Sequence, residues 1–543
     1  MKFLRYTLAI LGTMIIYAHS TATAQPRLVV NIVVSSMRAD DLTKYENNFS
    51  QGGFRRLINE GAYFTNASYD YMQTSTPVSL ATLSTGAMPS THGVIAEAWF
   101  DYVTNKRISL VDDSKEHSLN FSSGSGDYSP RQLTSQTLCD ALLEQSPESR
   151  MATIAVEPLS AIVMAGHTGE VYWMERNKSY WTTSSYYTEK LPEWVEKYNE
   201  GGMNQAYALE RWTTLLPYDN YHNSQVSFIE GLHSKNNKRI DFIGKAPTAT
   251  SKKKSDINSY DRMALTPAGN SAMFAFAKQV AAKCEMGKDE HTDILNIVLD
   301  TPRKICSHFG PESVEYEDML YRLDRDLADF LTFIVAQVKS PEQIVVMLTS
   351  DHGTSPSYNS PKGEKERFNT MQAEVITNAF IGSQHGTGQW VLGYIDRAIY
   401  LNHNLIYEKG LSVADIQHDV ATFVMQLRGV SHAVSAEAMR SSYFGSGYGR
   451  KIQNGFYPRR SGDVIINLMP GWIEERTAVR STSGSMYLYD RHVPLILFGG
   501  GITPQREERG VDMTTTATTL AHIIGINPPS AAEGEVLNIT NKR

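Results

Sequence analysis

The chain has 543 residues, of which 41% are hydrophobic and 20% are charged, a composition typical of folded proteins. Its formal net charge is -7 at pH 7, and it has no basic stripe with interleaved aromatic residues, so we expect no nucleic-acid partner. The length exceeds what one hydrophobic core needs, which predicts one large domain or two unequal ones.

The N-terminus has the features of a secretory signal peptide. Lys2 and Arg5 precede an apolar stretch over residues 8–17, and Ala-Thr-Ala follows at 22–24. This order predicts a signal peptide over residues 1–24, cleaved before Gln25. No later stretch reaches ~18 uninterrupted apolar residues, so we expect no transmembrane segment after cleavage. The sequence therefore predicts a periplasmic or secreted protein, and we expect its partner among other exported or envelope proteins.

In chain order, strands and helices alternate. The sequence predicts a strand at 27–34, a helix at 54–60, a loop that leads into a helix at 74–85, a helix at 132–143 and a strand at 151–156. A strand at 295–300, a helix at 316–337, strands at 345–350, 398–401, 464–468 and 493–498, and a helix at 514–524 follow. This alternation predicts an α/β fold with a doubly wound, mostly parallel sheet flanked by helices.

Three segments interrupt the alternation. Residues 98–130 are polar and predict a surface excursion, and two cap insertions are predicted at about 170–260 and 355–396, within a domain that covers 25–543. The first cap is rich in aromatic residues, which suit either a contact surface or packing onto the core: Tyr172, Trp173, Tyr180, Trp181, Tyr186, Tyr187 and Trp194.

The three cysteines are Cys139, Cys284 and Cys306. An odd, widely spaced set is not a disulfide framework, and no CxxC pair indicates a thiolate zinc site. One disulfide with a free thiol and three buried thiols both remain open.

Asp351 and His352 directly follow the apolar run 345–350 and precede Gly353. In an open α/β sheet, ligands bind outside the carboxyl ends of the strands. A carboxylate and an imidazole placed there make this strand end the candidate site.

Several motifs occur in a recognisable order along the chain: Met37-Arg38, Gly52-Gly53-Phe54, Thr85-Gly86, Pro89, His92-Gly93, Phe309-Gly310-Pro311, Asp351-His352-Gly353 and Asp490-Arg491-His492-Val493-Pro494-Leu495. With them, the sequence resembles the alkaline phosphatase superfamily, and within it the secreted bacterial phosphatases related to type I phosphodiesterases and nucleotide pyrophosphatases. The resemblance implies a site with two zinc ions, because an anionic phosphate ester needs concentrated positive charge to be attacked.

The resemblance places some site residues and loses others. It places Thr76 at the nucleophile position and Asp351 and His352 on two metal-ligand positions. The other four ligand positions carry side chains that are poor metal ligands: Ser35, Arg303, Ser307 and Ser483. Asp300 and His308, close to two of these positions, are candidates to substitute for the lost ligands.

The phosphate-binding positions differ as well. The resemblance places Glu97, Glu157 and Leu159 where these phosphatases carry an Asn, a Lys and an Arg. Carboxylates there would repel a dianion. A guanidinium cannot ligate a metal, and we expect Arg303 to pair with Asp351 in place of the metal charge.

The sequence therefore predicts a pseudophosphatase, a binding or scaffold module that holds no zinc or at most one zinc ion. The alternative is a divergent metal-dependent phosphatase or phosphodiesterase that uses Thr76 as its nucleophile.

Overall fold

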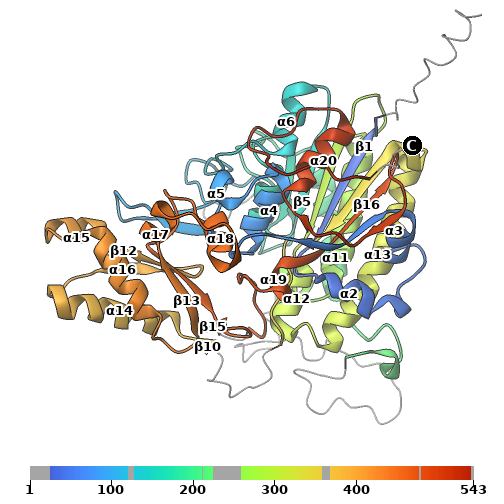
Figure 1. Ribbon diagram of the computed structural model, residues 1–543. Coiled ribbons are helices and arrows are strands. Elements are labelled where there is room, and N and C mark those ends of the chain that lie inside the picture. Colours follow the sequence, from blue (N-terminus) through green and yellow to red (C-terminus); the bar gives the residue numbers. More distant parts are fainter. Residues whose placement is uncertain are drawn as a thin grey trace, which may run out of the picture.

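The computed structural model describes residues 25–119, 127–210, 212–223, 259–357, 367–475 and 479–539. Ten strands form the main sheet: β1 (Leu28–Val34), β2 (Ala62–Ser68), β5 (Met151–Ala155), β6 (Glu170–Met174), β7 (Trp181–Thr182), β8 (Asp293–Leu299), β9 (Ile344–Thr349), β16 (His492–Gly499), β17 (Gln505–Glu507) and β18 (Val511–Asp512). Their order is β17-β2-β16-β9-β1-β8-β5-β6-β7, with β18 beside β2. The central strands β9, β1, β8, β5 and β6 are parallel, so the predicted fold class is confirmed (Figure 1).

Helices cover both faces of this sheet because successive side chains of a strand point to opposite faces. Val30 and Ile32 of β1 belong to the core under α2 (Ala39–Lys44), α3 (Phe54–Glu60), α11 (Ala268–Lys283) and α13 (Val314–Val338). Val29 and Val33 belong to the core under α4 (Thr76–Thr85), α6 (Leu138–Gln145), α7 (Pro158–Ala165) and α20 (Thr515–Ile524). All seven residues of β1 are buried, as the continuous apolar run predicts.

Most predicted elements occur within a few residues of their expected limits, but α6 begins at Leu138 rather than at residue 132. A capping box at Thr137 sets this start. The Thr137 hydroxyl accepts a hydrogen bond from the Asp140 N–H at 3.2 Å, and the Asp140 carboxylate accepts one from the Thr137 N–H at 3.0 Å.

Part of the first predicted cap belongs to the main sheet instead. β6 pairs in parallel with β5, and β7 pairs with β6. The side chains of Tyr172, Trp173 and Trp181 are buried, and the Trp181 ring stacks on Phe276 of α11 with ring centroids 4.1 Å apart. These three rings therefore pack the protein interior and are not a contact surface. Residues 224–258 of this cap lie outside the described residues.

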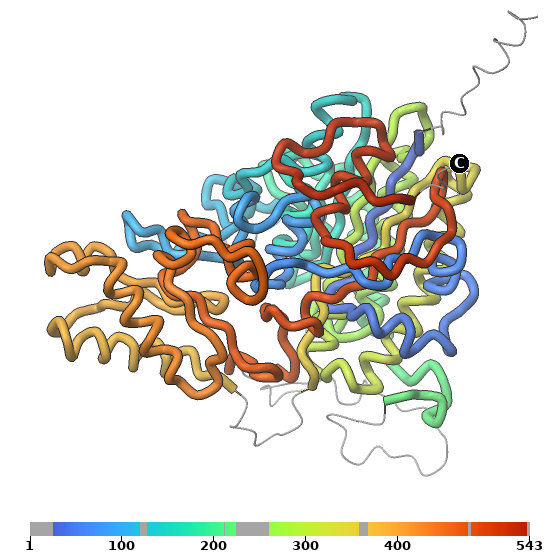
Figure 2. Tube along the Cα trace, in the orientation of Figure 1, coloured from blue at the N-terminus to red at the C-terminus, as the bar shows by residue number. Residues whose placement is uncertain are grey.

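A second, smaller sheet stands beside the main one. It is formed by β11 (Val391–Ile395), β12 (Ala398–Leu401), β14 (Val464–Leu468) and β13 (Val430–Ser435) in that order, all antiparallel. Helices α14 (Thr370–His385) and α16 (Val413–Val424) share its core, and the unit projects to one side of the molecule (Figure 2). The insertion expected at 355–396 is thus only the first part of this unit, and the predicted strands at 398–401 and 464–468 lie here.

All three cysteines are free thiols, with Cys139 and Cys306 buried. No helix among the described residues has both the length and the apolar character needed to cross a bilayer. The predicted signal peptide, residues 1–24, lies outside the described residues.

Candidate functional site

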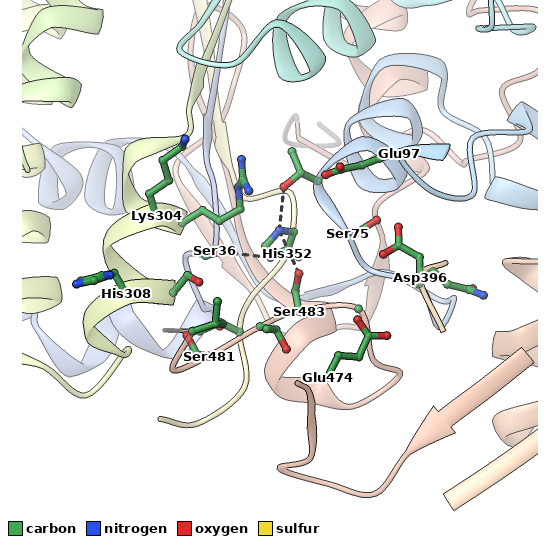
Figure 3. Close-up of a pocket in the computed structure, with 18 of the residues that line it drawn as sticks. Ser36, Ser75, Glu97, Lys304, His308, His352, Asp396, Glu474, Ser481 and Ser483 are labelled. Carbon is green, nitrogen blue, oxygen red and sulfur yellow. Dashed lines mark hydrogen bonds between the residues drawn. The ribbon is translucent and has the colours of Figure 1, made fainter. Parts of the chain in front are cut away.

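A cavity of about 420 Å³ opens at the carboxyl ends of β1, β8 and β9. Its wall includes Thr76, the first residue of α4, together with Arg303 and Ser307 of α12 (Thr301–Phe309). His352 lies near its centre, with Ser483 beside it (Figure 3). Because strand ends in parallel sheets meet at one edge, residues far apart in sequence converge here.

Asp351 is completely buried and is held by three hydrogen bonds. It accepts from the Ser35 hydroxyl at 2.7 Å, from the Ser36 N–H at 3.1 Å and from the His352 N–H at 2.8 Å. Ser36 adopts a left-handed backbone conformation with φ of 66°, which is uncommon for a residue with a side chain. Both oxygens of Asp351 are therefore satisfied by hydrogen-bond donors that neighbour β1.

His352 links Asp351 to the nucleophile position. Its Nδ1 lies 2.6 Å from the carbonyl oxygen of Gly353, and a carbonyl only accepts, so Nδ1 carries the proton. Its Nε2 is then an acceptor for the Thr76 hydroxyl at 3.1 Å, and the Ser483 hydroxyl lies 3.4 Å away. Burial lowers the pKa of His352 below its ordinary value, which favours this neutral form.

Arg303 has a different partner from the one expected. Its Nη2 lies 3.5 Å from Asp300 Oδ1, whereas Asp351 is bound by Ser35. Asp300 is fully buried, where it also accepts from the Ser160 hydroxyl at 2.6 Å and the Glu157 N–H at 2.9 Å. The expectation of an Arg303–Asp351 ion pair is therefore wrong, because Asp300 and Ser35 provide closer partners.

Glu157 does not line the cavity, and neighbouring groups compensate its charge. Its carboxylate accepts from the Tyr260 hydroxyl at 2.6 Å and forms ion pairs with Lys304 and with Arg176. Burial opposes ionisation, but Lys304 outweighs it and lowers the pKa of Glu157 to about 2. Glu97, in contrast, lines the cavity (Figure 3). Of the two carboxylates expected to repel an anion, Glu97 is the one that faces the pocket.

A two-zinc site does not fit these donors. Zinc is bound by imidazoles, thiolates and carboxylates, with at least three protein ligands per ion. Asp351 and His352 are such donors, whereas Ser35, Ser307 and Ser483 offer neutral hydroxyls and Arg303 offers a cation. No three His, Cys, Asp or Glu side chains converge as a ligand group in the part of the chain that the structure describes. His308 does not substitute, because it lies apart from His352 (Figure 3).

The smaller sheet and a separate two-stranded sheet, β10 (Arg367–Phe368) with β15 (Ile473–Glu474), bring further charged residues to the cavity that the sequence did not indicate. Asp396 and Arg397 form the two-residue turn between β11 and β12, and Glu474 lies in β15 (Ile473–Glu474). Arg397 Nε lies 3.2 Å from Glu474 Oε1. A charged pair between two short apolar strands is the sole sequence signal for this turn, and it does not reveal that the turn faces the site.

Comparisons with known proteins cover most of the chain. The family model for type I phosphodiesterase / nucleotide pyrophosphatase matches residues 29–480. The chain is 29% identical over 525 residues to alkaline phosphatase PafA of Elizabethkingia meningoseptica, covering 95% of this chain and 94% of that protein. It is 29% identical over 519 residues to alkaline phosphatase PhoV of Synechococcus elongatus, covering 95% and 92%.

The crystal structure of wild-type alkaline phosphatase PafA superposes with a TM-score of 0.86 at 27% identity, covering 94% of this chain and 98% of that one. The chain therefore belongs to the type I phosphodiesterase / nucleotide pyrophosphatase family, in the PafA-like branch of the alkaline phosphatase superfamily.

Proposed function

We propose that this protein is a pseudophosphatase, in which the phosphatase fold has become a binding module with no resident zinc pair. The observation that carries the proposal is the 2.7 Å hydrogen bond from Ser35 to Asp351. The family resemblance puts a ligand carboxylate at position 35, and here a hydroxyl group donates a hydrogen bond to the remaining carboxylate instead. Arg303, at another ligand position, adds a fixed cation to the same cavity.

A second candidate is a phosphoric ester hydrolase that acts through Thr76, and the comparisons with proteins named alkaline phosphatases favour it. The Thr76 hydroxyl donates to His352 Nε2 at 3.1 Å, the arrangement of a nucleophile with a neighbouring base. His352 is fixed in the accepting tautomer by Gly353. These contacts can activate a hydroxyl group, but they lack the positive charge that two metal ions supply.

Hydrolysis of an aryl phosphate separates the two candidates. The pseudophosphatase proposal expects no turnover above buffer, with or without added zinc. The hydrolase candidate expects turnover that Thr76→Ala lowers at least a hundredfold, because the nucleophile is lost. Turnover that survives Thr76→Ala would point to a contaminating phosphatase and leave the proposal standing.

We further propose that the protein is exported and acts in the periplasm or outside the cell, with an exported or envelope protein as partner. The signal-like residues 1–24 support this placement. Mass spectrometry of the chain from the native host tests it: a mature N-terminus at Gln25 is expected, and an intact N-terminus at Met1 would contradict it.

A further inference from the structure

We propose that a surface beside the smaller sheet, outside the cavity, binds an acidic peptide segment of a partner protein. The surface lies on α17 (Ala436–Ser441), α18 (Gly447–Asn454) and the residues that join and follow them (Figure 1). This inference rests on the proposed function, because it gives the binding module a surface for its partner. We call it the tyrosine–arginine surface, and its members are exposed side chains: Arg440, Tyr443, Tyr448, Arg450 and Arg459.

Positive charge is concentrated in this part of an acidic chain. Residues 436–460 contain five cations and one carboxylate, a net charge of +4, whereas the whole chain has a net charge of -7. Arg460 is buried, and the segment stays positive without it. A local charge opposite to that of the chain favours an acidic partner, because complementary charge guides association and disfavours other partners.

Neighbouring carboxylates compensate only part of this charge. Arg450 Nε and Lys451 Nζ share one carboxylate, that of Asp70, each at a distance of 3.1 Å. Among the described residues, no carboxylate lies within ion-pair distance of Arg440 or Arg459. The surface therefore has guanidinium groups that can pair with carboxylates of another molecule.

Arg440 is held beside Arg459 by contacts that leave most of its donors unused. Its Nη2 donates to the carbonyl oxygen of Pro458 at 3.3 Å, and its guanidinium lies over the Phe456 ring. A guanidinium has five N–H donors, and Pro458 occupies one of them. Arg440 can therefore still bind a carboxylate while its position is fixed.

Gln453 of α18 fixes the loop that joins the two helices. Its side chain donates to the carbonyl oxygens of Met439 at 2.9 Å and Ser442 at 2.8 Å, and it accepts from the Phe444 N–H at 3.1 Å. The Phe444 ring packs so closely on Gly449 that a Cβ there would clash with it. A loop that is fixed before binding loses less conformational entropy when the partner binds.

Two tyrosine side chains project from this loop. Tyr443 is 89% exposed and lies against Gly445, and Tyr448 is 48% exposed and packs edge-on against His432, with ring centroids 4.6 Å apart. Ser, Gly and Tyr make up eight of the nine residues from 441 to 449. These residue types are enriched in antibody binding loops, and Tyr and Arg dominate binding energy at protein interfaces. The composition therefore favours a protein partner.

Two other occupants fit this surface less well. In a two-fold contact between copies of this chain, the surface would face itself and oppose like charges. Membrane-surface segments insert Trp, Phe or Leu, whereas the exposed rings here are tyrosines on a loop of Ser and Gly. An acidic protein segment satisfies both the arginines and the tyrosines.

Fluorescence anisotropy with a labelled dodecapeptide of alternating Glu and Pro tests the proposal on the mature chain. Its Pro rings can pack on tyrosine faces, and a dodecapeptide of alternating Gln and Pro is the uncharged control. We expect the Glu–Pro peptide to bind at least tenfold more tightly at low salt, and high salt should reduce the difference. Equal affinity for the two peptides would overturn the proposal. Binding to anionic vesicles or to an acidic polysaccharide, without binding to the Glu–Pro peptide, would contradict a protein partner.

Two variants test the surface directly. Arg459→Glu should weaken the Glu–Pro peptide at least tenfold and change the Gln–Pro peptide less than twofold, whereas Tyr443→Ala should weaken both peptides. The matched controls are Tyr407→Ala, at a residue that is 66% exposed, and Lys409→Glu, both at the end of α15 (His403–Glu408). Figure 1 shows α15 at the outer end of the smaller unit, away from α18, so neither control should change binding. Unchanged affinity in both surface variants would refute the assignment.

Zinc content and aryl phosphate hydrolysis, measured on the same samples, separate this inference from the function on which it rests. Two zinc ions per chain with turnover, in a chain that still prefers the Glu–Pro peptide, would overturn the pseudophosphatase proposal alone. An inactive chain with at most one zinc ion that binds neither peptide would overturn the tyrosine–arginine surface alone.

Discussion

At the scale of single residues, hydrogen bonds hold the two side chains that the family resemblance places on metal-ligand positions. Asp351 receives a hydroxyl and two backbone N–H donors, and His352 spans the Gly353 carbonyl and the Thr76 hydroxyl. A buried carboxylate without donors is strongly destabilising, so Asp351 needs such partners. Ser35 provides the hydrogen-bond donor to Asp351 Oδ2.

Ser35→Ala removes that donor and tests its role. Asp351 Oδ2 also lies 3.4 Å from His352 Nε2. That nitrogen cannot replace the lost donor, because the proton of His352 lies on Nδ1. We expect the free energy of unfolding to fall by about 1–3 kcal/mol, the cost of a buried acceptor left unpaired. Urea unfolding measures it, with Ser530→Ala as an exposed-site control. An unchanged free energy of unfolding would show that Asp351 does not depend on Ser35.

At the scale of elements, side chains on the main-sheet helices hold the edge strands and carry buried charge. β7 is fixed to α8 (Glu193–Glu200) by Asn199, which donates to the Trp181 carbonyl and accepts from the Trp181 N–H, both at 2.8 Å. The Trp181 ring then fills the space above α11. The aromatic segment therefore extends the core over a sheet edge.

Trp181→Ala tests this packing. The side chain is fully buried and stacked on Phe276, so its removal should cost about 3–5 kcal/mol of unfolding free energy. Tyr443→Ala, at a residue that is 89% exposed, is the matched control and should be nearly neutral. Equal stability of the two variants would show that Trp181 contributes little to the core. It would favour the alternative that this segment is a contact surface.

The first turn of α13 holds a buried acid, Glu315, whose pKa burial raises to about 7. The unfolded chain ionises it near its ordinary value of about 4.3. Stability from the protonated form is therefore present at low pH and is lost as pH rises from about 4.5 to about 7, by about 3–4 kcal/mol in total.

Glu315→Gln mimics the protonated acid and should remove this loss. We expect the variant to match the wild type at pH 4 and to be about 3–4 kcal/mol more stable at pH 8, measured by urea unfolding. The exposed-site control Glu408→Gln should show no such difference. A variant less stable than the wild type at pH 8 would mean that ionised Glu315 has a favourable partner.

Sequence reasoning predicted the elements of the main sheet well because buried parallel strands are continuous apolar runs, as at residues 28–34 and 344–349. It missed β6 and β7 as sheet members because the segment that holds them mixes Tyr and Trp with Asn and Lys and shows only weak periodicity. It also missed Arg397 and Glu474 at the site, since side chains from separate sheets meet there through tertiary structure alone. The partner of Arg303 was mispredicted because Asp300, which directly follows β8 and is the N-cap residue of α12, lies within ion-pair distance of it.

At the scale of the whole molecule, the chain keeps the full architecture of its phosphatase relatives, with 94% of it superposing on the PafA structure. The cavity lies between the main sheet and the smaller sheet, and the positions where the family resemblance implies metal ligands carry Ser35, Arg303, Ser307 and Ser483. Fold and chemistry are separable in this way because catalysis depends on a few side chains attached to a scaffold. The donor set, rather than the fold, decides what this pocket binds.

Zinc content after dialysis against a zinc buffer, measured by mass spectrometry on the wild type, tests the central claim most directly. A variant that returns metal ligands to the four positions, Ser35→Asp, Arg303→Asp, Ser307→His and Ser483→His, is the positive control. The pseudophosphatase account predicts at most one zinc ion per chain in the wild type and two in the variant. Two zinc ions per chain in the wild type would contradict it.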